Sequence, residues 1–151
     1  MGRRLSALLH LPFLDLDEEI EKQSGLRIAD IFQQQGAEEF RLLEHQVLKK
    51  VLERKPRMVI STGGGTPCFC GNLALMEQVG TLVFLNPSPE EIASRLEKND
   101  GRMRPLLAGE GILLDKIKHL REERLAFYNK ASLIYEGSSA EELISMAGFP
   151  A

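Results

Sequence analysis

The sequence predicts an α/β fold with three layers (α/β/α), in which helices cover both faces of a parallel β-sheet. Short runs of consecutive apolar residues, which are typical of strands, alternate along the chain with segments whose apolar residues recur at helical spacing. The strands are apolar throughout and do not alternate with polar residues, which indicates a parallel sheet that is buried on both faces. In such folds ligands bind at the carboxyl ends of the strands.

Each element follows from its local sequence. The expected strands cover residues 13–17, 58–62, 81–85 and 132–135. The expected helices cover residues 5–9, 17–22, 27–34, 38–53, 72–78, 88–97, 114–129 and 139–146. Gly36 separates the third helix from the fourth, and Asp17, Ser88 and Ser139 are the expected N-caps. Ser88 has Glu91 three residues later, which is the spacing of a capping box.

Composition narrows the class of protein. The 151 residues fit one domain, and 43% hydrophobic with 27% charged residues is ordinary for a globular protein. A net charge of −3 argues against nucleic-acid binding. The sequence has no apolar run near the ~18 residues of a membrane span and no signal peptide, so we expect a cytoplasmic protein that acts without a membrane.

Cys68 and Cys70 lack the further ligands that a zinc site needs and are expected to be small loop side chains.

Two groups of residues lie where strands are expected to end. Asp15 and Asp17 could place two carboxylates together, one to hold Mg²⁺ through water and one to take a proton from a hydroxyl, or they could be a helix cap and a solvated acid. Gly63, Gly64 and Gly65 follow the second strand directly. They could form a tight turn, but three glycines exceed what a turn needs, and we favour a backbone that approaches a ligand closely.

Arginines are the remaining candidates. Arg41 has Glu44 three residues later, either as a surface ion pair or as a carboxylate that orients Arg41 to bind an anionic ligand. Arg102, Arg104 and Arg124 could be solvated charges. The first two lie in a segment rich in glycine and arginine, which is the composition of a lid that closes over phosphates.

Taken together, these motifs resemble one family along nearly the whole chain. They are Phe13-Leu14-Asp15-Leu16-Asp17, Ile28-Ala29-Asp30-Ile31-Phe32, Gly36-Ala37-Glu38-Glu39-Phe40-Arg41, Ser61-Thr62-Gly63-Gly64-Gly65, Arg104-Pro105-Leu106-Leu107 and the segment from Arg124 to Tyr128. Their order and joint content resemble the shikimate kinases. The resemblance implies an ATP-dependent kinase that transfers the γ-phosphoryl group to the 3-hydroxyl of shikimate, on the route to chorismate and aromatic amino acids.

The resemblance also implies a fold and a role for each candidate. The fold is that of phosphate-loop kinases related to nucleoside monophosphate kinases, as one domain over residues 1–151 with a lid at about 99–113. Asp17 is the implied base and shikimate ligand, and Asp15 the acid near Mg²⁺. Arg41 and Arg124 bind the shikimate carboxylate, Gly63–Gly65 lie beneath the substrate, and Arg104 meets the phosphates of ATP. We expect a monomer.

One part of the family pattern has no counterpart in these residues. The family begins with a central strand and a phosphate loop, G-x-x-G-x-G-K-[ST], and that motif does not occur in this sequence. We therefore expect the strands at 58–62 and 81–85 to lie apart, and residues 1–151 to show no ATP-dependent phosphorylation of shikimate. The alternatives are a paralogue that binds shikimate or a partner without catalysis, and a different small-molecule kinase of the phosphate-loop class.

Overall fold

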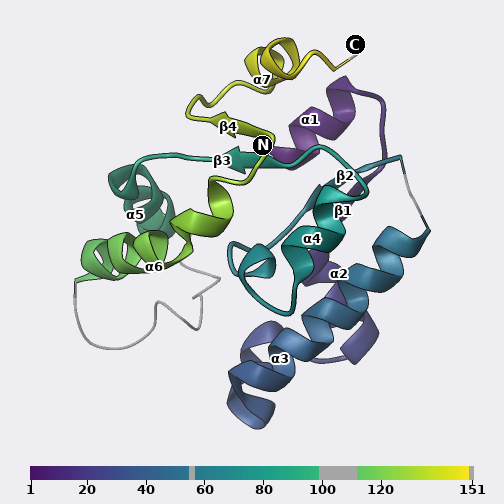
Figure 1. Cartoon of the computed structure of the whole chain (residues 1–151). Helices are drawn as coiled ribbons and strands as arrows, with labels where there is room; N and C mark the ends of the chain where they lie inside the picture. The colour runs from purple at the N-terminus through teal and green to yellow at the C-terminus, as the bar shows by residue number, and fades with distance from the viewer. Residues whose placement is uncertain (55–56, 99–111, 150–151) are drawn as a thin grey trace.

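The computed structural model describes residues 1–54, 57–98 and 112–149, and in them it contains every strand and helix that the sequence predicts (Figure 1). The predicted lid, including Arg102 and Arg104, lies mostly outside these residues. The elements are α1 (Gly2–Leu8), β1 (Phe13–Asp15), α2 (Leu16–Ser24), α3 (Ile28–Glu53), β2 (Val59–Ser61), the 3₁₀-helix η1 (Thr66–Cys68), α4 (Asn72–Glu77), β3 (Val83–Leu85), α5 (Pro89–Lys98), α6 (Leu113–Tyr128), β4 (Leu133–Tyr135) and α7 (Ala140–Ala147).

The start of α2 differs from the prediction. Strand β1 ends at Asp15, and α2 begins at the next residue. Asp15 is the N-cap, because its Oδ1 atom accepts hydrogen bonds from the backbone N–H groups of Asp17 at 3.0 Å and Glu18 at 3.3 Å. The predicted cap at Asp17 is therefore wrong. An aspartate at either position could satisfy the first N–H groups of the helix, and here the earlier one has the extended backbone that a cap requires.

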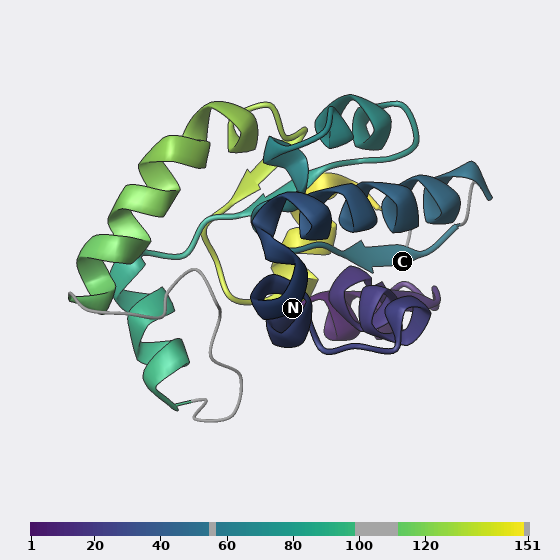
Figure 2. The same ribbon diagram turned by 90° about the horizontal axis from the view of Figure 1, so that it is seen from below.

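The other predicted helix signals are confirmed. The Ser88 N–H donates to the Glu91 carboxylate at 3.0 Å, and the Glu91 N–H donates to the Ser88 hydroxyl at 3.2 Å, which is a complete capping box. The Ser139 hydroxyl accepts a hydrogen bond from a backbone N–H in the first turn of α7. At Gly36 the backbone takes φ +86°, so α3 changes direction there and is helical on both sides (Figure 2).

The strands form two parallel pairs. Strand β1 pairs with β2, in the register that places Asp15 opposite Ser61, and β3 pairs with β4, in the register that places Leu85 opposite Tyr135. Among the described residues, β2 and β3 are not hydrogen-bonded neighbours. The expectation that these two strands lie apart is therefore confirmed, whereas the single continuous sheet is replaced by two short ones.

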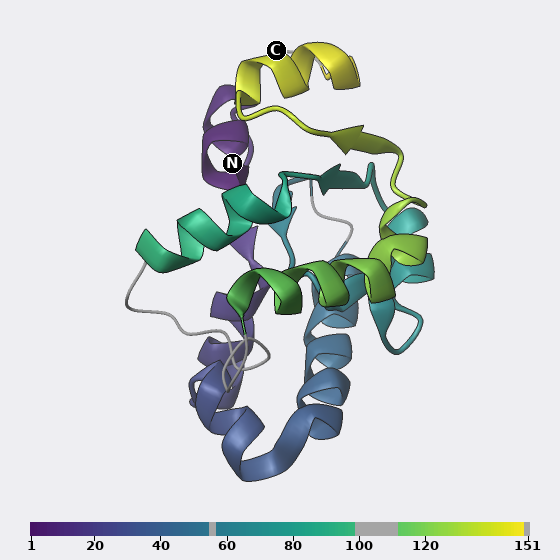
Figure 3. The ribbon, with the colours of Figure 1, turned by 90° about the vertical axis from the view of Figure 1, so that its left-hand side faces the viewer.

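Helices cover both faces of the strands and form the outer two of three layers. On one face, α1 and α7 lie side by side and enclose a cluster that contains Leu5, Leu143 and Tyr135 and includes Val59 of β2 at its border (Figure 3). On the other face, α2, α3 and α4 enclose a larger cluster that borders Ile60 of the same strand. Successive residues of a strand point to opposite faces, so β2 contributes to both layers of packing.

Helices α5 and α6 pack against each other to one side of the strands (Figures 1 and 3). Helix α6 also contacts η1, so it reaches the segment that follows β2. Within the described ranges, no helix has the length and apolar character needed to cross a membrane.

Candidate functional site

The glycine run Gly63–Gly65 lies directly after β2 and is the point where three predicted site residues meet. A Cβ atom at the first glycine would lie 3.4 Å from Oδ1 of Asp17, and one at the second would lie 3.5 Å from Nη1 of Arg124. A Cβ atom at the third would collide with the guanidinium of Arg41. The structure therefore gathers an acid from α2 and arginines from α3 and α6 around one stretch of backbone.

The backbone of the run argues against one interpretation of the glycines, a tight turn that needs glycine conformations. None of the three is among the glycines with positive φ, so the turn itself does not require them. Space requires a glycine at Gly65, where a Cβ atom would collide with Arg41, and is tight at Gly64, where a Cβ atom would lie 3.0 Å from the Tyr128 hydroxyl. A Cβ atom at Gly63 would make only ordinary contacts. The groups that approach the run belong to the protein itself, so the close approach of a ligand to this backbone stays a prediction.

Arg41 and Glu44 form an ion pair in the interior. Nη1 of Arg41 donates to Oε2 of Glu44 at 2.7 Å, and the two side chains are 12% and 1% exposed. The alternative of a solvated surface pair is therefore excluded. The guanidinium also lies 4.4 Å from the ring centre of Phe69 and 5.0 Å from that of Phe40, within the range of cation–π attraction. Arg41 is thus fixed by one carboxylate and two aromatic rings.

Helix α6 is attached to the glycine run by a tyrosine. The Tyr128 hydroxyl donates to the carbonyl oxygen of Gly64 at 2.6 Å, and its ring packs on Phe84 of β3 with 4.6 Å between ring centres. Arg124 lies one helical turn before this tyrosine, so the contact sets the distance between Arg124 and the glycine backbone. Tyr128 ends one of the motifs that carry the family resemblance, but its sequence context predicts no contact for it.

Two buried polar residues were not predicted at all. Thr66 and Asn72 are fully buried, and the Thr66 hydroxyl donates to Oε1 of Glu44 at 2.7 Å. Nothing in the sequence distinguishes them, because a threonine after a glycine run and an asparagine at the start of a helix are common in loops and caps. Their importance depends on where the fold places them.

Asp15, the predicted Mg²⁺ ligand, has only part of its carboxylate available for a metal ion. Oδ1 of Asp15 is occupied by capping α2, which leaves Oδ2 as the carboxylate oxygen that could reach a cation. The described residues contain no group of three or more His, Cys, Asp or Glu side chains that could hold a metal ion. A Mg²⁺ ion at Asp15 is compatible with this, because Mg²⁺ usually binds one or two carboxylates together with substrate phosphates and water. Arg104 lies outside the described residues.

The cysteines are free thiols near this cluster. Burial raises the pKa of the Cys68 thiol, although the nearby charges of Arg124 and Arg41 act in the opposite direction. A thiol with a raised pKa is a weak nucleophile at neutral pH. Cys68 is the last residue of η1, so the expected loop position is wrong for this cysteine.

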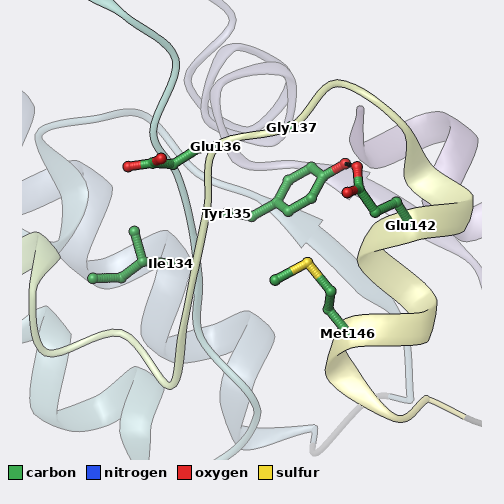
Figure 4. Close-up of a pocket in the computed structure, with 6 residues that line it drawn as sticks. All are labelled: Ile134, Tyr135, Glu136, Gly137, Glu142 and Met146. Carbon is green, nitrogen blue, oxygen red and sulfur yellow. Dashed lines mark hydrogen bonds between the residues drawn. The ribbon is translucent and has the colours of Figure 1, made fainter.

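A pocket of about 400 Å³ lies elsewhere, between β4 and α7 (Figure 4). In its wall the Tyr135 hydroxyl lies 2.7 Å from Oε2 of Glu142, and both burial and this contact raise the pKa of the tyrosine. The pocket is lined by Ile134, Tyr135, Glu136, Gly137, Glu142 and Met146. None of the predicted site residues lines it, so it is separate from the glycine cluster.

Comparison with known proteins identifies the family. A family model described as shikimate kinase matches residues 1–147. The chain belongs to the shikimate kinase family. The shikimate kinase of Bacteroides fragilis is 40% identical over 144 residues, which cover 94% of this chain and 79% of that protein. That of Aquifex aeolicus is 42% identical over 142 residues, with 94% and 81% covered.

Solved structures of shikimate kinases have the same fold. The crystal structure of the Bacteroides thetaiotaomicron shikimate kinase matches with a TM-score of 0.89 and 34% identity, covering 98% of this chain and 90% of that one. A shikimate kinase from Acinetobacter baumannii, solved in complex with shikimate, matches with a TM-score of 0.88 and 31% identity, covering 97% and 83%. The resemblance and the predicted fold class are therefore confirmed.

Proposed function

We propose that this member of the shikimate kinase family takes part in the reaction of that family, the transfer of the γ-phosphoryl group of ATP to the 3-hydroxyl of shikimate. Residues 1–151, which contain no G-x-x-G-x-G-K-[ST] motif, are proposed to bind shikimate without phosphorylating it by themselves. One observation carries the proposal: Asp17, Arg41 and Arg124 converge on Gly63–Gly65 at the carboxyl end of β2. Two cations and one acid around this glycine backbone match a small substrate that has a carboxylate at one end and hydroxyl groups at the other.

The arginines bind the carboxylate end of shikimate. A guanidinium offers parallel N–H donors that fit a carboxylate in a bidentate manner. Glu44 occupies Nη1 of Arg41, which leaves the other nitrogen atoms of that group for the substrate. Arg124 approaches Gly64, the neighbour of the glycine that Arg41 approaches, and supplies the second positive charge.

Asp17 acts at the hydroxyl end. Its carboxylate lies beside Gly63, where it can accept a hydrogen bond from a substrate hydroxyl and take the proton as the phosphoryl group is transferred. Asp17 comes from the first turn of α2, so the capping of this helix by Asp15 also fixes the base. In phosphoryl transfer most catalysis comes from such positioning and from stabilisation of charge.

ATP and Mg²⁺ complete the proposal. Bound Mg²⁺ neutralises charge on the phosphates of ATP, and Asp15 would hold it through Oδ2 and water. Arg104 is assigned to the phosphates from the family resemblance alone. We further propose that the protein acts as a monomer, because all of these side chains come from one chain, and that it works in the cytoplasm, where ATP is available.

The substrate half of the proposal is tested by calorimetric titration of shikimate into the 151-residue chain. Arg41→Ala removes a charge-assisted contact that is typically worth about 1.5–3 kcal/mol, so we expect binding to weaken about 10- to 100-fold. Arg41→Lys should also bind poorly, because an ammonium lacks the planar fork. Arg27→Ala, which changes an exposed arginine next to the start of the same helix, is the matched control. Equal affinity of the wild type and Arg41→Ala would rule out this site.

A further inference from the structure

A continuous chain of hydrogen bonds leads from Arg41 to His45 through three buried residues, Glu44, Thr66 and Asn72. Arg41 donates to Oε2 of Glu44, and Oε1 of the same carboxylate accepts from the Thr66 hydroxyl, both at 2.7 Å. The backbone oxygen of Thr66 accepts from the side-chain amide of Asn72 at 2.9 Å. The amide oxygen of Asn72 lies 2.7 Å from Nδ1 of His45. The chain begins and ends on α3 and passes through η1 and α4.

The donors in this chain can be assigned from one another. The Asn72 amide nitrogen donates to Thr66, so the amide oxygen must be the atom that faces His45. Nδ1 of His45 therefore carries the proton and donates. Each of the four hydrogen bonds then has one possible direction.

The burial of these groups needs an explanation beyond packing. Glu44 is 1% exposed, and Thr66 and Asn72 are 0% exposed, whereas apolar residues of the same volume would fill the space without the cost of removing polar groups from water. The end of the chain that reaches the site is the Arg41 guanidinium. A buried polar network in which all bonds are made holds its members in one arrangement, and here that arrangement fixes the guanidinium.

We propose that Thr66 and Asn72 are positioning residues for the shikimate carboxylate and act through Glu44 on Arg41. This rests on the proposed function of Arg41. The hydroxyl of Thr66 holds one oxygen of Glu44 so that the other points at Nη1 of Arg41. Asn72 holds the backbone of Thr66, and His45 holds Asn72. Without the hydroxyl, the carboxylate can rotate and the guanidinium loses its fixed orientation.

The test compares Thr66→Val with Thr66→Ser in calorimetric titrations of shikimate into the 151-residue chain. Valine has nearly the shape of threonine but no hydroxyl, and we expect it to weaken binding about tenfold. Serine keeps the hydroxyl and should restore affinity to within about twofold, which a role in packing alone would not produce. Thr81→Val, at an exposed threonine just before β3, is the matched control and should bind as the wild type. If Thr66→Val does not fold, Thr66→Ala takes its place with the same expectation.

A second arm shows whether the effect passes through Arg41. In the Arg41→Ala background, Thr66→Val should cause no further loss, because the group that it positions is absent. The methyl ester of shikimate, which lacks the negative charge, should bind the wild type and Thr66→Val equally. Wild-type affinity of Thr66→Val, or an equal further loss in the Arg41→Ala background, would overturn this inference and leave the proposed function intact. Wild-type affinity of Arg41→Ala would instead overturn the proposed function.

Discussion

Replacement of Glu44 by glutamine is the perturbation that probes the site most directly. Glutamine has the same shape and can still hydrogen-bond to Thr66 and Arg41, but it carries no charge. Arg41 would then be a cation that is 12% exposed and has lost the negative charge 2.7 Å away. We therefore expect Glu44→Gln to destabilise the fold itself, in addition to any loss of substrate binding.

The magnitude follows from the distance and the burial. Two unit charges separated by the 2.7 Å seen here attract by about 6 kcal/mol at an effective dielectric constant of about 20. Breaking a buried pair by removing one partner typically costs about 3–5 kcal/mol. Glutamine keeps hydrogen bonds, so we expect the lower end, about 3 kcal/mol of unfolding free energy. For a chain of this length that is a decrease of roughly 6–12 °C in Tm.

The assay is thermal and urea unfolding followed by circular dichroism. Glu39→Gln changes an exposed glutamate on the same helix and should stay within about 0.5 kcal/mol of the wild type. Arg41→Met combined with Glu44→Gln should lose less than the sum of the two single changes, because the uncompensated charge is gone. Wild-type stability of Glu44→Gln would refute the reasoning, since it would mean that the pair is solvated.

Two further results are expected. Gly65→Ala adds a Cβ atom that collides with the Arg41 guanidinium, and we expect it to weaken shikimate binding about tenfold or more, the scale of overpacking. Calorimetric titration measures this. The control Gly80→Ala, whose Cβ atom lies in open space, should bind shikimate as the wild type does. Hydrogen bonds, first from its own backbone N–H and then from Arg4, lower the pKa of Glu141 from the usual 4.5 to about 2. A lowered pKa stabilises the folded state above about pH 4.5, and this contribution is lost as the pH falls toward 2. In urea unfolding, the stability difference between the wild type and Glu141→Gln should therefore shrink over that pH interval. A difference that stays constant with pH would contradict the lowered pKa of Glu141.

The sequence predicted local structure well because the signals that set it are local. Ser88 and Glu91 form a capping box at the expected spacing, and Gly36 interrupts α3 where a break was expected. The cap of α2 was assigned to Asp17 instead of Asp15 because two aspartates near a helix start are equivalent in sequence and differ only in backbone conformation.

The parts of the site that sequence could not supply depend on contacts between distant segments. Arg41 and Glu44 were paired from their spacing, but whether the pair was buried or solvated depended on packing that brings η1 against α3. Thr66 and Asn72 acquire their importance only from that contact. Spacing along one helix predicts which side chains are neighbours, whereas burial is a property of the whole fold.

The two faces of β2 have a consequence for how the molecule unfolds. Val59 borders one hydrophobic cluster and Ile60 the other, so consecutive residues of one short strand belong to separate cores. The two clusters otherwise draw on different helices, mainly α1 and α7 for one and α2, α3 and α4 for the other. Regions of a fold that pack in different clusters can open with different free energies, which hydrogen exchange measures. Strand β2 is the element that the two clusters share. We therefore expect Val59→Ala to weaken amide protection mainly in α1 and α7, and Ile60→Ala to weaken it mainly in α2, α3 and α4.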